Sequence, residues 1–66
     1  MAIFENLENR IKESLMENGP ILQTELYKFF DPIIQNDISS ILYFMEKDER
    51  IKRTKQGKTY LIEYKG

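Results

Sequence analysis

The sequence contains neither cysteine nor histidine. Their absence excludes disulfide bonds, thiolate nucleophiles and imidazole bases, and it removes the ligands of nearly all zinc sites. No apolar run approaches the roughly 20 residues that cross a bilayer. The first five residues, Met1 to Glu5, lack the charged and apolar regions of a secretion signal. We therefore expect no membrane partner and a cytoplasmic location.

A chain of 66 residues has little room for an enzyme cleft, because it buries only about 60% of its unfolded surface. Glu46, Asp48 and Glu49 are close in sequence, but no nucleophile or metal-ligand pattern surrounds these acids. We therefore expect neither an enzyme nor a cofactor, and no small-molecule ligand is evident. No repeat or linker interrupts the sequence, so residues 1–66 are expected to form one domain.

Charge is distributed unevenly, although the net charge is only -1. Residues 1–49 carry four cations and ten acids, a net of -6, whereas residues 50–66 carry six cations and one acid, a net of +5. Five of the cations fall within nine consecutive positions: Arg50, Lys52, Arg53, Lys55 and Lys58. This pattern is typical of a polyanion-binding end, and also of a solvated sheet edge on which lysines prevent strand pairing.

Apolar periodicity predicts three helices. The first is expected from about Ile3 to Asn18, ended by Gly19 in a left-handed cap and by Pro20, which cannot extend a helix. The second is expected from Leu22 or Thr24 to Phe30, before a turn at Asp31-Pro32.

The third helix is predicted from about Ile34 to Asp48, with either Asp31 and Pro32 or Asn36 at its start. Its apolar stripe consists of Ile34, Ile38, Ile41, Leu42 and Met45. By the helical period, the opposite face should expose Asn36, Ser40, Tyr43 and Lys47 together. Phe44 falls on the flank between the two faces.

The last 17 residues predict a hairpin of two strands, residues 50–54 and 59–64, around a glycine-containing loop. Ile51, Tyr60 and Ile62 should face the helices, and Ile21 is a candidate third strand. The expected core comprises Leu7, Ile11, Leu15, Leu26, Ile38, Leu42, Met45, Ile51, Tyr60 and Ile62.

The order helix, short strand, helix, turn, helix, basic hairpin resembles the winged-helix DNA-binding family of bacterial and archaeal regulators over nearly the whole chain. The matching stretches are Asn18-Gly19-Pro20-Ile21, Glu25-Leu26, Ile38-Ser39-Ser40-Ile41-Leu42, Met45-Glu46, Ile51-Lys52-Arg53 and Gly57-Lys58-Thr59-Tyr60. The resemblance implies an α+β fold, a winged helix-turn-helix of three helices with a C-terminal two-stranded hairpin wing. It also implies a sequence-specific transcriptional regulator that binds double-stranded DNA, with a homodimer on two half-sites as one arrangement.

The resemblance assigns the third helix to the major groove and the wing to the phosphate backbone. The recognition-helix candidates are Gln35, Asn36, Ser39, Ser40, Tyr43 and Lys47, and the wing candidates are Arg53, Lys55, Gln56 and Lys58. Glutamine and asparagine can bond adenine edges bidentately, and serine can bond either a base or a phosphate.

The chain departs from the family at two places. Many relatives have Gly-Leu before the wing, where this chain has Glu49-Arg50, so a residue with a Cβ or a different turn must make the connection. DNA-binding relatives often carry Arg or Lys early in the third helix, whereas this chain has Asp37 and no cation there. A fainter resemblance to binders of left-handed DNA, through Tyr43, lacks their asparagine, which is Ser39 here, and their Pro-Pro wing.

A protein-interaction module, or a subunit of a larger complex without direct DNA binding, is the alternative function. Winged helices also serve as adaptors, and this chain has more large apolar side chains than one small core readily hides. The residues in question are Phe29, Phe30, Tyr43, Phe44 and Leu61. Some of them are expected at an interface, and a homodimer through the first helix would be compatible with either function.

Overall fold

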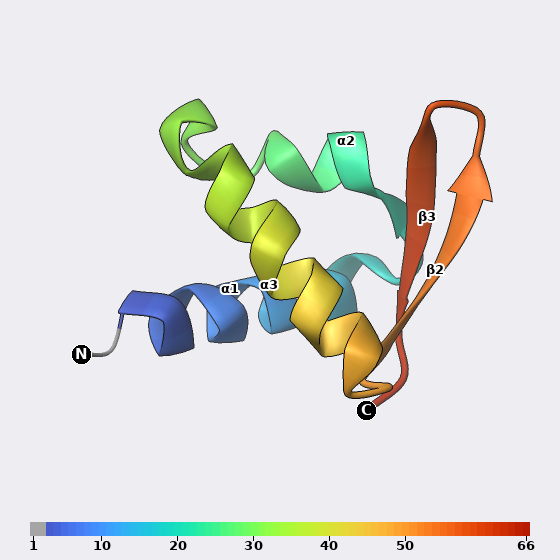
Figure 1. Ribbon diagram of the computed structural model, residues 1–66, viewed down its shortest axis with the longest axis horizontal. Coiled ribbons are helices and arrows are strands. Elements are labelled where there is room, and N and C mark those ends of the chain that lie inside the picture. The colour runs from blue at the N-terminus through green and yellow to red at the C-terminus, as the bar shows by residue number, and fades with distance from the viewer. Residues whose placement is uncertain (1–2) are drawn as a thin grey trace.

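The computed structural model describes residues 3–66, with side chains from Asn6 onward. Within these residues it contains three α-helices and a three-stranded antiparallel sheet, so the chain is of the α+β class (Figure 1). The elements are α1 (Ile3–Asn18), β1 (Ile21–Leu22), α2 (Gln23–Tyr27), the 3-10 helix η1 (Pro32–Ile34), α3 (Gln35–Lys47), β2 (Ile51–Gln56) and β3 (Thr59–Tyr64).

Helix α1 has the predicted bounds and the predicted cap. Gly19 takes a φ of 71°, and its N–H donates to the carbonyl of Leu15 at 2.9 Å. Helix α2 is shorter than predicted, because the chain turns after Tyr27 and the N–H of Phe30 bonds the carbonyl of Tyr27 instead of extending the helix. Asp31 accepts the N–H of Ile33, so it caps η1 and α3 begins later.

The hairpin docks on β1 to form a sheet of order β1-β3-β2. Ile21 pairs with Ile62, which confirms the expected third strand, and Ile51 pairs with Tyr64 at the base of the hairpin. Strand β2 continues to Gln56, so the loop is two residues long, shorter than predicted. Gly57 supplies the positive φ of 62° that such short loops commonly require.

The connection from α3 to β2 uses Glu49 at a φ of 61°, a residue with a Cβ in the left-handed region. The N–H of Arg50 bonds the carbonyl of Met45 at 2.9 Å, the long-range bond of a Schellman motif. Glu49 therefore takes the backbone conformation that glycine adopts at most helix ends of this kind.

The core lies between α1, α2 and α3 and one face of the sheet. It consists of Leu7, Ile11, Leu15, Leu26, Phe30, Ile38, Ile41, Leu42, Met45, Ile51 and Ile62. Tyr60 was wrongly expected there: it is 37% exposed, because it lies two residues beyond Ile62 toward the tip of the hairpin. Phe30 is buried and its neighbour Phe29 is exposed.

Among the residues that the structure describes, none of the helices has both the length and the apolar character that crossing a membrane requires.

Candidate functional site

The outer face of α3 carries most of the residues singled out in the sequence. Asn36, Ser40, Tyr43 and Lys47 are exposed together, which confirms the predicted helix facing, and Gln35 is exposed beside them. Ser39 is half-buried on the flank. In the part of the chain described, no hydrogen bond engages the side chains of Gln35, Asn36 or Ser40. Their donors and acceptors are therefore available to a ligand.

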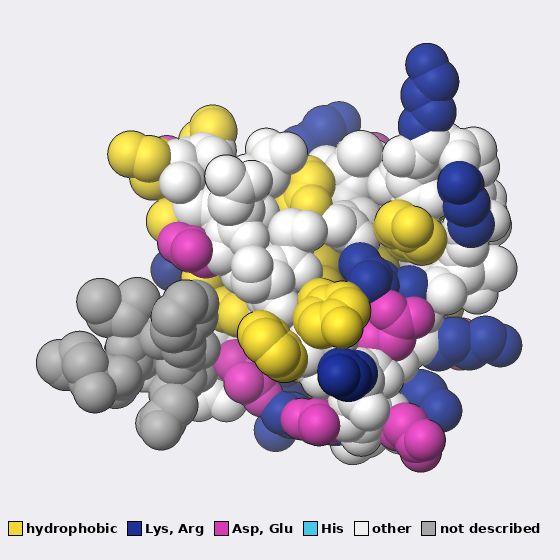
Figure 2. Space-filling model, viewed as in Figure 1, with side chains coloured by type: hydrophobic (Ala, Val, Ile, Leu, Met, Phe, Trp, Pro, Cys, Tyr) yellow, Lys and Arg dark blue, Asp and Glu magenta, His cyan; other side chains and the backbone are white. Residues whose placement is uncertain are grey.

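The character of this face changes along the helix. Its second half exposes Tyr43 by 50% and Phe44 by 62%, and the two rings meet edge to face at 5.5 Å. The Nζ of Lys47 lies 5.8 Å from the centroid of the Tyr43 ring. Figure 2 shows hydrophobic side chains beside basic and acidic ones over this end of α3. A polar surface, which includes the exposed acid Asp37 in the first turn, thus changes along α3 into an aromatic and cationic one.

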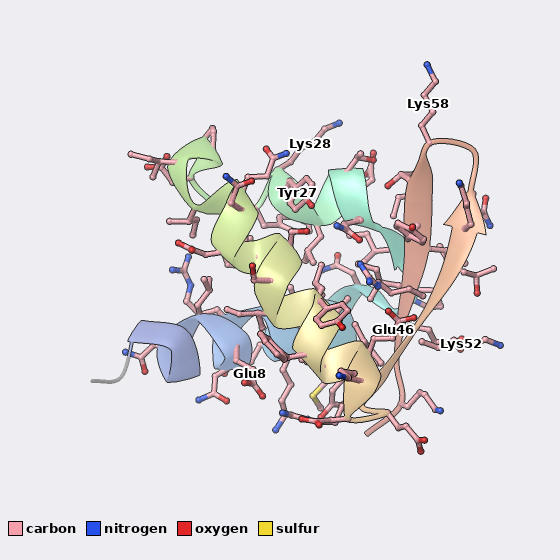
Figure 3. The ribbon with its side chains drawn as sticks, viewed as in Figure 1. Glu8, Tyr27, Lys28, Glu46, Lys52 and Lys58 are labelled. Atoms are coloured by element: carbon pink, nitrogen blue, oxygen red, sulfur yellow. The ribbon has the colours of Figure 1, made fainter. Side chains whose placement is uncertain are left out.

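The hairpin exposes three lysines, Lys52, Lys55 and Lys58. Lys58 projects from the tip, away from the rest of the molecule (Figure 3). Lys52 lies on the other face of the sheet from Lys55, opposite Glu63 in the strand register. No carboxylate of residues 6–66 forms an ion pair with any of the three. Gln56 is exposed at the end of β2, so the tip is polar and cationic.

Arg53 differs from these lysines, although the sequence grouped it with them. Its side chain is only 13% exposed. Its Nε donates to Oε1 of Glu46 on α3 at 2.9 Å, and its Nη2 lies 2.8 Å from the same oxygen in an ion pair. The guanidinium also lies 4.9 Å from the centroid of the Tyr60 ring. The positive charge of Arg53 is therefore paired with a carboxylate of the same molecule.

Gln23 and Glu46 also belong to the site, although neither was among the site residues predicted from the sequence. Gln23 is a buried polar side chain at the start of α2. Its Oε1 accepts a hydrogen bond from Nη1 of Arg53 at 3.3 Å, and its Nε2 donates one to the hydroxyl of Tyr27 at 2.6 Å. Strand alternation, which places Arg53 on the same face as Ile51, was the available signal for an inward-facing arginine.

A hollow of about 320 Å³ lies beside the aromatic end of α3. It is lined by Glu8, Ser40, Ile41, Phe44, Met45, Asp48 and Arg50. Arg50 forms an ion pair with Glu8 of α1, and the pKa of Arg50 is raised because its guanidinium donates a hydrogen bond to that carboxylate. Arg50, the residue before β2, thus connects the base of the hairpin to α1, at the end remote from Lys58.

A shallower depression of about 530 Å³ lies near the start of α3. Its lining comprises Thr24, Tyr27, Lys28, Phe30, Pro32 and Gln35. Lys28 is exposed there, with its Nζ 3.6 Å from a carboxylate oxygen of Glu25. Lys28 therefore places a positive charge near the polar half of α3, but this charge is paired with Glu25.

No family model matches the chain, and the searches of curated proteins and of solved structures found no significant match.

Proposed function

We propose that the chain is a winged-helix DNA-binding protein that regulates transcription, with α3 in the major groove and the β2–β3 hairpin as the wing. The observation that carries the proposal is the exposed polar face of α3, on which Gln35, Asn36 and Ser40 make no hydrogen bond within the described residues. Figure 2 shows this face and basic side chains of the hairpin in one view.

The chemistry of α3 suits base recognition in its first half. The major groove is about 12 Å wide and admits a helix with its side chains. Gln35 and Asn36 each offer an amide that can bond adenine bidentately, while Ser39 and Ser40 can bond bases or phosphates. Tyr43 and Lys47, about two and three turns beyond Asn36, would meet the groove wall and the backbone.

The hairpin supplies the contacts that do not depend on sequence. Lys55 and Lys58 are exposed and form no ion pair within residues 6–66, whereas Arg53 is already paired with Glu46. With Lys47 added from α3, we count three phosphate contacts at most. Each neutralised phosphate contributes about -0.9 to the slope of log affinity against log salt, so the slope should lie between about -2 and -3.

The test is a titration of the protein against random duplex DNA at several salt concentrations. The proposal expects binding that weakens with that slope, and tighter binding to duplexes selected from a random library. An absence of duplex binding at low salt would overturn it.

Protein interaction remains a second candidate because of Phe44. This ring is 62% exposed and projects next to the 320 Å³ hollow that it helps to line. A two-fold axis would bring the projecting ring of each copy to the hollow of the other, so the partner we propose for this surface is a second copy of the chain. Ser40 also lines the hollow, so such a dimer would cover part of the proposed DNA surface.

Sedimentation at tens of micromolar distinguishes the two candidates. A dimer that Phe44→Ser dissociates, and that Phe29→Ser leaves intact, would support interaction through this patch. Phe29 is a suitable control because it is 51% exposed on the turn after α2 and outside the hollow. A monomer throughout would leave the proposed DNA-binding surface uncovered and make recognition of two half-sites improbable.

A further inference from the structure

The side chain of Arg53 connects β2 to three other elements. It bonds Glu46 on α3, it bonds Gln23 on α2, and its guanidinium lies over the ring of Tyr60 on β3. Gln23 is held in turn by the hydroxyl of Tyr27. We call these five residues the Arg53 network. Figure 3 shows Glu46 on α3 directed toward the hairpin.

The contacts are those of an ordered pair. Nε and Nη2 of Arg53 approach the same oxygen of Glu46, at 2.9 and 2.8 Å, and Nη1 is left for Gln23. The arginine side chain is 13% exposed and the glutamate side chain 40%, so water screens the pair less than it screens a pair at the surface. The planar guanidinium then fixes direction as well as distance.

The Arg53 network lies between the buried base of the hairpin and its exposed tip. Ile51, two residues before Arg53, is buried in the core, whereas the side chains of Thr54 through Lys58 are all exposed. Arg53 is therefore the last side chain of β2 that is held against the helices. One register position further, Thr54 lies opposite Leu61, which still pairs with Leu22 of β1. From Lys55 and Tyr60 to the tip, no strand of the described residues pairs with the hairpin, and its direction there depends on its own ladder of hydrogen bonds.

We propose that the Arg53–Glu46 pair fixes the angle between the hairpin and α3, so that Arg53 is a positioning residue and not a phosphate contact. Its effect on DNA is to hold Lys55 and Lys58 where the backbone passes when α3 lies in the groove. Binding then avoids the cost of ordering the hairpin at the moment of contact. The consequence for DNA rests on the proposed function, whereas the geometry of the pair does not.

Glu46→Gln gives a test in which the two roles predict opposite signs. The substitution removes a negative charge close to the proposed DNA surface and releases Arg53. If Arg53 served phosphates, affinity would rise and the salt slope would steepen by about one unit. If Arg53 is a positioning residue, the substitution frees the hairpin from α3, and affinity for DNA should fall by about threefold to tenfold at an unchanged salt slope. Glu63→Gln, on the other face of the sheet, is the charge-matched control.

A measurement without DNA separates this inference from the proposed function. Because the chain has no cysteine, spin labels can be placed at Ser40→Cys on α3 and Gln56→Cys at the hairpin tip. The distribution of distances between the labels should be narrow in the otherwise unaltered chain. It should broaden in Glu46→Gln and in Arg53→Gln. The swapped pair Glu46→Arg with Arg53→Glu should narrow it again.

The outcomes are distinct. A distribution that stays narrow in Glu46→Gln, in protein that keeps its thermal transition, overturns the inference whatever the DNA titration shows. A distribution that broadens in protein that binds no duplex supports the positioning of the hairpin and rejects the DNA function. Broadening together with weaker binding at constant slope supports both. Glu46→Gln is isosteric and partly exposed, so it should not unfold the chain, even if Arg53→Gln does.

Discussion

Ile38 and Leu42 lie one turn apart on α3, and neither exposes any of its surface. Both belong to the single core cluster that also contains residues of α1, α2 and the sheet. Their burial fixes which face of α3 is left outside, so the orientation of the proposed DNA surface depends on these two residues.

Ile38→Asp or Leu42→Asp should unfold the chain. Either change buries an unpaired carboxylate at a cost of several kcal/mol, against a total stability of about 5 kcal/mol for a domain of this size. Circular dichroism should show no cooperative thermal transition in these variants. Ser40→Asp, on the exposed side of the same helix, should keep the transition. A variant at position 38 or 42 that melts normally would contradict the packing described here.

Local signals predicted most of the fold. The capped stop at Gly19 located the end of α1, and the helical period identified the buried and exposed faces of α3. The end of α2 was missed, because the competing turn after Tyr27 leaves no strong signal before Asp31. Tyr60 was misplaced, since alternation gives the face of a strand but not where the core beneath that face ends.

The candidate site was less predictable, because it depends on contacts between distant residues. Exposure of Asn36, Ser40 and Lys47 followed from helical geometry alone. The pairing of Arg53 with Glu46 required the angle between β2 and α3, and the contact with Gln23 required the packing of α2 as well. Strand alternation places Arg53 on the same face as Ile51, but the sequence gives no sign of its partner, and Arg53 was predicted as a wing contact with Lys55 and Lys58.

Glu49→Gly should stabilise the chain. Glu49 has a φ of 61°, and the left-handed conformation costs a residue with a Cβ roughly 1–2 kcal/mol, part of which glycine loses again as entropy of the unfolded chain. We expect a gain of about 0.5–1 kcal/mol, visible as a higher urea midpoint at unchanged m-value. Asp48→Gly is the matched control, because Asp48 has a φ of -81° and should lose stability on the same change.

Asn36→Ala and Ser40→Ala should reduce discrimination between selected and random duplexes. Each lost base contact is worth about 1–3 kcal/mol of preference, while stability should hardly change because both residues are exposed. Competition titrations with the two duplexes measure the ratio directly. Asn9→Ala, an exposed asparagine on α1, is the control. Equal losses of affinity on every sequence would reassign the two residues to backbone contacts.

Lys55→Gln with Lys58→Gln should weaken binding to selected and random duplexes alike. Phosphate contacts position a protein without reading sequence, so the ratio of the two affinities should stay constant. Two lost phosphate contacts should flatten the salt slope by up to about 2 units, which leaves about one unit for Lys47. Because both lysines are exposed and form no ion pair within residues 6–66, the thermal midpoint should barely move.

The matched control for this pair is Lys65→Gln, which removes an exposed lysine just after β3, at the base of the hairpin. There the backbone N–H of Lys65 bonds the carbonyl of Arg50, far along the strands from Lys58 at the tip. The control should leave the slope of the unaltered chain in place, apart from a small uniform change in affinity through long-range charge. If it flattened the slope as much as the loss of Lys55 and Lys58, the cations would act through net charge, and the hairpin would have no defined place on the backbone.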